Sequence, residues 1–208
     1  MNDDYITIKD HNNEDTHLRE LYSVTVFGNR VSTTVTRRAT VVRKWIYRIR
    51  HRHRFRRNRF LVGLGVQWRP DISNQGATLQ LCVGRQCLIF QILHANFIPR
   101  ILKRFLANDS ITFVGVYNHT DSRMLKRDYN LSVVRLLELG SVANLRGASM
   151  ETLAYSILGF HGIKKPQWIA RSDWEVKWLT SDQVQYASVD AYLSFEIGKK
   201  LKAWNHDT

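Results

Sequence analysis

The chain has 208 residues, of which 44% are hydrophobic and 11% aromatic, which is enough to build the core of one domain. No apolar run reaches the roughly 18 residues that a membrane-spanning helix needs. The first twenty residues contain no apolar segment of the kind found in secretory signals. A formal net charge of +13 instead favours a partner that carries phosphate groups.

The N-terminal region predicts a lead, a hairpin, a helix and a strand, in that order. Residues 1–19 are rich in acids and are expected to be a mobile lead before a single domain over residues 20–208. LYSVTVFGNRVSTTVT (21–36) alternates around Gly28-Asn29, a hairpin pattern. Over residues 39–53, Val41, Trp45 and Ile49, together with Val42 and Ile46, recur at helical spacing. FLVGLGVQW (60–68) is typical of a buried strand and is stopped by Arg69-Pro70.

A second hairpin is predicted over residues 77–93, with Gly84-Arg85 at its turn. Cys82 and Cys87 would then face each other across the two strands, so a disulfide is geometrically conceivable. A chain with only two cysteines fits a reducing compartment, the nucleus or the cytoplasm. We therefore predict two packed, reduced thiols.

The C-terminal half alternates strands and helices. It predicts a short helix with Pro99 in its first turn, a strand over 111–118, a helix over 119–130, a helix opened by Ser149, and a long helix over 181–204 capped by Thr180 or Ser181. The expected fold class is therefore α/β, with a mixed sheet flanked by helices and an N-terminal hairpin and helix ahead of it.

Positive charge is concentrated between residues 37 and 59. This block holds eleven of the 31 Lys and Arg residues and no acid. Its segment RIRHRHRFRR suits a single-strand groove in which bases stack on aromatic rings and phosphates meet arginine. We predict that Arg52, Arg54, Arg56 and Arg57 contact nucleic acid. Two alternatives stay open: a solvated helix face that continues into a basic loop, and a nuclear localisation signal.

Three motifs, taken in order, resemble a known family. They are VGLGVQWRP (62–70), FVGVYNHTDSRMLKRDY (113–129) and LTSDQVQYASVDAY (179–192). Together they are similar to the 3′–5′ exonuclease domain of the Werner-type and ribonuclease D group, within the DEDD exonucleases that carry a terminal tyrosine. The resemblance covers about residues 60–204 and is strongest to small stand-alone plant members. It implies a ribonuclease-H-like fold.

The resemblance assigns site positions one by one. It places the aspartate of the second motif at Asp121, and the tyrosine and aspartate of the third motif at Tyr186 and Asp190. Asp121 and Asp190 would hold metal, and Tyr186 would position the attacking water. In active relatives the first motif reads Asp-x-Glu, and those two positions here are Gly65 and Gln67. The four metal-binding carboxylates of the family thus become two.

The loss matters because two divalent cations about 3.5–4 Å apart need carboxylates to offset their charge. Gln67 keeps the shape of glutamate and a neutral carbonyl oxygen, whereas Gly65 offers no side chain. Asp71 follows Pro70 beyond the strand and is not expected to substitute. Mg²⁺ or Mn²⁺ is the expected cofactor if any metal is bound.

Two functions remain open. We favour a nucleic-acid-binding protein that keeps the exonuclease fold but is impaired or inactive as a nuclease. The alternative is an active metal-dependent 3′–5′ exonuclease on single-stranded RNA or DNA. By resemblance we also expect a homo-oligomer, with a hexameric ring as one form.

Overall fold

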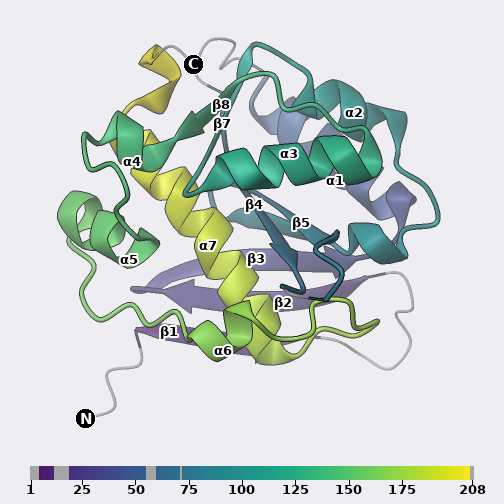
Figure 1. The fold of residues 1–208 in the computed structure, drawn as a ribbon, viewed down its shortest axis with the longest axis horizontal. Helices are drawn as coiled ribbons and strands as arrows, with labels where there is room; N and C mark the ends of the chain where they lie inside the picture. The colour runs from purple at the N-terminus through teal and green to yellow at the C-terminus, as the bar shows by residue number, and fades with distance from the viewer. Residues whose placement is uncertain (1–4, 12–18, 55–59, 71, 207–208) are drawn as a thin grey trace.

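One mixed β-sheet forms the centre of the molecule in a computed structural model, which describes residues 5–11, 19–54, 60–70 and 72–206. The order of the eight strands is β1-β2-β3-β6-β5-β4-β7-β8 (Figure 1). The strands are β1 Ile6–Asp10, β2 Glu20–Val26, β3 Asn29–Thr36, β4 Phe60–Trp68, β5 Gly76–Val83, β6 Gln86–Phe90, β7 Ile111–Gly115 and β8 Leu136–Glu138. The pairs β3/β6, β4/β7 and β7/β8 are parallel and the others are antiparallel. The predicted α/β class with a mixed sheet is confirmed.

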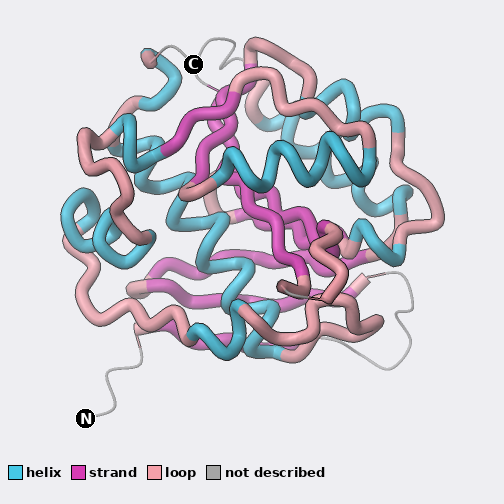
Figure 2. The backbone as a smooth tube through the Cα atoms, viewed as in Figure 1, coloured by secondary structure: helices cyan, strands magenta, loops and turns pink. Residues whose placement is uncertain are grey.

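Helices cover both faces of this sheet, and long loops join them (Figure 2). The helices are α1 Ala39–Arg52, α2 Arg100–Leu106, α3 Asn118–Tyr129, α4 Leu139–Val142, α5 Met150–Leu153, α6 Gln167–Ala170 and α7 Ser181–Lys200. A π-helical turn, Ala154–Leu158, continues α5, and two 3₁₀ turns span Ile92–His94 and Ala203–Asn205.

The long helix α7 crosses one face of the sheet, as Figure 1 shows. It begins with a capping box, in which the hydroxyl of Thr180 accepts from the Gln183 N–H and the Gln183 side chain accepts from the Thr180 N–H. Thr33 of β3 contacts Ser188 of α7, so the strand face that holds Thr33 is the one α7 covers. In β4 the corresponding face is that of Gly63, Gly65 and Gln67.

The opposite face carries α1, α2 and α3. Phe105 of α2 packs edge-on against Phe60 of β4 and Phe113 of β7, with ring centroids 6.0 and 5.7 Å apart. α1 lies beside α2, and its apolar stripe, which includes Trp45 and Ile49, is fully buried. Its charged residues consequently face solvent.

Two expectations about the N-terminal half need correction. Residues Ile6–Asp10 of the expected mobile lead form β1, which pairs with β2 because its alternating pattern extends the sheet edge. Cys82 and Cys87, predicted as reduced thiols, are joined by a disulfide. Their antiparallel register places them directly opposite each other with Cα atoms 4.2 Å apart, so the cross-strand geometry that the hairpin pattern predicted prevails over the compartment argument.

Candidate active site

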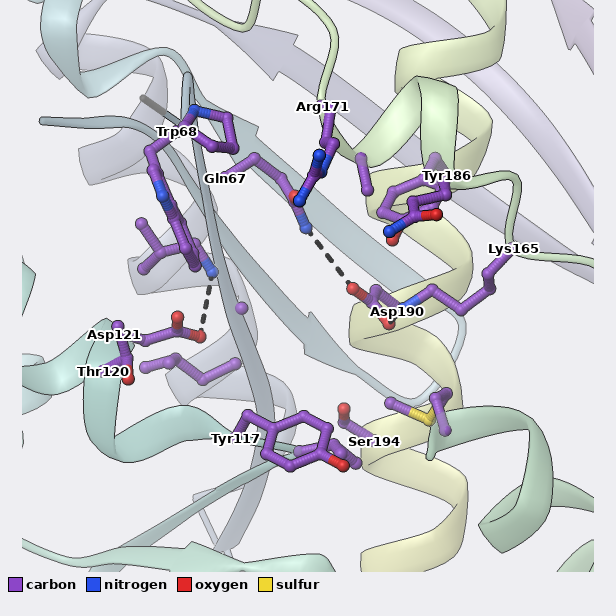
Figure 3. A pocket seen from close by; sticks show the side chains of 18 residues that line it. Gln67, Trp68, Tyr117, Thr120, Asp121, Lys165, Arg171, Tyr186, Asp190 and Ser194 are labelled. Atoms are coloured by element: carbon purple, nitrogen blue, oxygen red, sulfur yellow. Dashed lines mark hydrogen bonds and ion pairs between the residues drawn. The ribbon is translucent and has the colours of Figure 1, made fainter. Parts of the chain in front are cut away.

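A cleft of about 380 Å³ opens where the C-terminal half of β4 lies between α3 and α7 (Figure 3). Its lining includes all five positions that the three motifs predict, namely Gly65, Gln67, Asp121, Tyr186 and Asp190. Residues up to 125 positions apart in the sequence therefore converge on one site.

The end of β7 explains how Asp121 reaches β4. The two strands pair in parallel only as far as Gly63 and Val114, so the backbone of β4 beyond that point is open on this side. α3 begins three residues after β7 and places Asp121 in its first turn. The Val66 N–H donates to Asp121 Oδ2 at 3.2 Å. A negative charge in the first turn of a helix also interacts favourably with the positive end of the helix dipole.

The Asp121 carboxyl is held in an unfavourable environment for its charge. Its side chain is only 7% exposed. Burial raises the pKa of Asp121 well above its usual value, and the nearby Asp190 charge raises it further. The hydrogen bond from Val66 and the charge of Lys165 act in the opposite direction but are smaller.

Asp190 has a donor on each of its carboxylate oxygens. Gln67 Nε2 donates to Oδ2 at 3.3 Å, and Lys165 Nζ pairs with Oδ1 at 2.5 Å. Figure 3 shows both side chains pointing toward Asp190. Gln67 was expected to offer its carbonyl oxygen, but here its amide nitrogen faces the carboxylate.

Lys165 is the main site residue that the motifs do not reveal. Its ammonium lies 4.7 Å from the centre of the Tyr186 ring, a cation–π contact. Burial alone would lower the pKa of Lys165, but the Asp190 and Tyr186 charges outweigh it and raise that pKa. Burial also raises the pKa of Tyr186. Lys165 comes from the loop before α6, where neither periodicity nor a motif marks it.

The space above Gly65 is partly filled from the neighbouring strand. Gly65 pairs with Gln80 of β5, and a Cβ atom added to Gly65 would lie 3.1 Å from Gln80 Oε1. The Gln80 side chain is fully buried and donates to Thr78 Oγ1 at 2.6 Å. Among the described residues its Oε1 has no hydrogen-bond donor. An amide oxygen thus points at the position where the family has an aspartate.

The ligands present do not fit a pair of divalent cations. Within residues 5–11, 19–54, 60–70 and 72–206, no group of three or more His, Cys, Asp or Glu side chains could hold a metal ion. The nearby Glu138 is already used, since it accepts from the backbone N–H groups of Asn118 and Gly140. Asp71 lies outside the described residues.

Arg52 and Arg54, the two predicted nucleic-acid-binding arginines that the structure describes, do not line this cleft. Arg52 is the last residue of α1, and Arg54 follows it with its guanidinium 2.7 Å from His51 Nε2. Arg56 and Arg57 lie outside the described residues. The positive charges in the cleft come instead from Lys165 and Arg171.

The fold is thus an α/β domain in which strand β4 of a mixed sheet lies between two acid-bearing helices, α3 and α7. A model described as 3′-5′ exonuclease matches residues 67–203, more than half of the chain. The chain therefore belongs to the 3′–5′ exonuclease family. The matched region begins at Gln67 and so leaves Gly65 outside it.

Two curated relatives and one solved structure illustrate this membership. A 3′-5′ exonuclease of Arabidopsis thaliana is 31% identical over 68% of this chain and 52% of its own length. The bifunctional 3′-5′ exonuclease/ATP-dependent helicase WRN of Mus musculus is 33% identical over 68% of this chain and 11% of its own. The chain thus spans about half of the first relative and a small part of the second. NrnC of Brucella melitensis shares the fold, with a TM-score of 0.59 at 16% identity over 69% of this chain and 72% of that one.

None of the helices in the described part of the chain is both long and apolar enough to cross a membrane.

Proposed function

We propose that this chain binds single-stranded nucleic acid in the cleft and cleaves it poorly or not at all. The observation that carries the proposal is the face of β4 inside the cleft, where Gly65 and Gln67 stand at the two positions that need carboxylates. The family membership supports the nucleic-acid partner, and the altered face supports the loss of chemistry.

Charge balance explains why this face decides the reaction. Two divalent cations bring four positive charges into a partly buried site, where their repulsion is strong. Asp121 and Asp190 offset at most two of them. Burial raises the pKa of Asp121 and so reduces its share further, while Lys165 already pairs with Asp190.

The same arrangement favours binding of a phosphate without metal. Lys165 and Arg171 line the cleft and can donate charge-assisted hydrogen bonds to a phosphodiester. Lys165 is held in place by its ion pair and by the Tyr186 ring. A tethered ammonium supplies part of the positive charge that a metal ion supplies in a two-metal nuclease.

The second candidate is an active metal-dependent 3′–5′ exonuclease. Its support is the close placement of Asp121, Tyr186 and Asp190, which the family uses for metal binding and water positioning. If the protein is an active exonuclease, one cation would have to displace Lys165 from Asp190.

A gain-of-function experiment separates the two candidates. The unchanged protein should degrade a 3′-ended oligonucleotide poorly in saturating Mg²⁺ or Mn²⁺. Gly65→Asp together with Gln67→Glu should raise the rate by at least about tenfold, equivalent to about 1.4 kcal/mol of barrier. Asp121→Ala should abolish this gain. The new Cβ at position 65 requires Gln80 Oε1 to move by a few tenths of an ångström, which a side-chain amide can do.

The matched control is Gly65→Asn in the otherwise unchanged chain. It gives both positions the shape of the family's side chains without their charges, so its cleavage rate should stay at that of the unchanged protein. Melting curves should show that all variants are folded. Asp121-dependent cleavage by the unchanged protein would overturn the proposal in favour of the second candidate.

The kind of nucleic acid that is bound and the oligomeric state are also part of the proposal. We expect binding of single-stranded RNA or DNA, and a homo-oligomer whose ring form would be a hexamer. Light scattering of the purified chain measures the assembly directly, and a monomer at micromolar concentration would contradict this part.

A further inference from the structure

A second hollow lies between α1 and α2, on the sheet face opposite α7. Its volume is about 360 Å³, and it shares no lining residue with the cleft. We call it the α1–α2 groove and define it by Arg43, Tyr47, Arg50, Phe97, Arg100 and Arg104. Nothing in the three nuclease motifs accounts for it.

Helical spacing brings the basic residues of the groove together. Arg43, Tyr47 and Arg50 follow each other at i, i+4 and i+7 and so share one face of α1. Arg100 and Arg104 are one turn apart on α2. All four arginines are exposed, whereas the inner stripe of α1 is fully buried. Four guanidinium groups therefore surround one hollow.

Positive charge in this groove is not offset locally. Neither segment 37–59 nor segment 84–108 contains any Asp or Glu. In the described part of the chain, none of the four guanidinium groups forms an ion pair with a carboxylate. Other basic residues of the molecule do so, as Arg69 with Asp173 and Lys165 with Asp190. Clustered like charges repel each other, and a polyanion relieves that repulsion.

Two aromatic rings add a feature that a solvated basic face does not need. Tyr47 is 58% exposed and Phe97 is 55% exposed, and both line the groove. Neither ring packs against another aromatic side chain of the described residues. Exposed rings among arginines match the chemistry of single-stranded nucleic acid, whose bases stack and whose phosphates accept bidentate hydrogen bonds.

We propose that the α1–α2 groove is a second binding site for single-stranded nucleic acid, with phosphates on its four arginines and bases on Tyr47 and Phe97. Its volume lies within the range of small-ligand sites and suits one or two nucleotides. The proposal goes beyond the cleft and rests on the proposed function only in taking nucleic acid as the partner.

Binding of a fluorescent single-stranded oligonucleotide in EDTA tests the groove. Replacing Arg43, Arg50, Arg100 and Arg104 by Gln should weaken binding by at least about tenfold near 0.1 M salt. The slope of log K against log salt should flatten by about 0.7 for each phosphate that the variant no longer neutralises. Tyr47→Ala with Phe97→Ala should weaken binding without changing that slope, because stacking releases no counterions.

A matched control removes four charges elsewhere. Arg30→Gln, Arg123→Gln, Lys126→Gln and Lys200→Gln together change the net charge equally at exposed positions outside both sites. This variant should lose less than about threefold in affinity if the groove, rather than overall charge, holds the strand. Equal losses in both quadruple variants would overturn the proposal.

Three further outcomes identify the partner and separate this proposal from the first. If poly-glutamate binds as tightly as the oligonucleotide and the ring variant binds normally, the partner is an acidic protein and the nucleic-acid assignment fails. If only Lys165→Gln with Arg171→Gln weakens oligonucleotide binding, the groove fails while the cleft proposal stands. Cleavage by the unchanged protein in Mg²⁺ would overturn the proposed loss of chemistry and leave the groove intact.

Discussion

At the scale of single residues, the cleft treats its two aspartates differently. Asp190 has a donor on each oxygen and a counter-charge in Lys165. Asp121 has one backbone donor, little exposure and a second carboxylate nearby. Ionising Asp121 therefore costs free energy in the folded protein, and this cost should be visible in the stability of the metal-free protein.

We predict that Asp121→Asn stabilises the protein in EDTA at pH 7.5. Because the folded-state pKa of Asp121 is raised, the folded protein binds the proton more tightly than the unfolded chain does. The contribution of the Asp121 carboxyl to the free energy of unfolding is therefore fully present below the pKa of the unfolded chain, near 3.9. It is lost as the pH rises toward the pKa of the folded protein. The variant should melt at least about 2 °C higher at pH 7.5, the shift expected for roughly 0.5–1 kcal/mol in a domain of this size.

The comparison at pH 4 and the variant Asp109→Asn serve as controls. At pH 4 the gain from Asp121→Asn should shrink, since the unfolded carboxyl is then about half protonated. Asp109 is exposed, so its replacement should leave the melting temperature unchanged at either pH. A variant that melts at or below the wild-type temperature at pH 7.5 would show that Asp121 carries no such cost.

The five motif positions of the cleft could be predicted from the sequence, whereas its other polar groups could not. Strand alternation places Gly65 and Gln67 on one face of β4. The resemblance of the three motifs to the exonuclease family assigned both of them and Asp121 to a single site. The contacts of Lys165 and Gln80 depend on a loop path and on strand register. Neither is fixed by local spacing, and so neither residue stood out.

At the scale of elements, α7 is pressed directly against β4. A Cβ atom added to Gly63 would lie 2.0 Å from the Ala191 carbonyl oxygen and 2.8 Å from the Phe195 nitrogen. Both are backbone atoms of α7, which cannot move aside one at a time. This close approach sets the height of α7 above the strand and thereby the position of Asp190 over Gln67.

We predict that Gly63→Ala destabilises the fold by about 3 kcal/mol or more, at or above the upper end of the usual cost of overpacking. Urea unfolding followed by circular dichroism measures it. Gly65→Ala is the matched control on the same strand face, since its new Cβ meets only the end of the Gln80 side chain, at 3.1 Å. It should cost less than about 1.5 kcal/mol. Coincident unfolding midpoints for the two variants would contradict the close-approach argument.

Long periodic elements were predicted well, and short edge elements were not. The helix over 39–52 and the strand over 60–68 have strong patterns because each buries a full stripe or face. β8 has three residues and α4 and α6 have four each, too few for any periodicity to show. β1 was missed because the acids of the segment around it outweighed its short alternating pattern.

At the scale of the whole molecule, the N-terminal hairpin supports the loop that carries Lys165. The rings of Tyr5, Phe27 and Phe160 form a continuous stack, with centroids 4.9 and 4.2 Å apart and nearly parallel planes. Phe27 is in the hairpin turn, where it and Gly28 both have positive φ. A bulky residue rarely adopts that conformation, so packing of its ring must offset the strain. Phe160 stands five residues before Lys165 and links the first strands to the cleft.

We predict that Phe27→Ala loosens residues 159–166 as well as the hairpin. Removing the middle ring of the stack should lower the free energy of unfolding by about 1–2 kcal/mol. Amide hydrogen exchange in segment 159–166 should speed up by about tenfold, because that loop loses its support.

Phe97→Ala is the matched control: Phe97 is an exposed aromatic residue that stacks on no ring of the described chain, so its replacement should leave exchange in this segment unchanged. Weaker binding of single-stranded oligonucleotide at the cleft should accompany the faster exchange, since Lys165 is then less firmly placed beside Asp190. Unchanged exchange in segment 159–166 would mean that the ion pair with Asp190 holds the loop by itself.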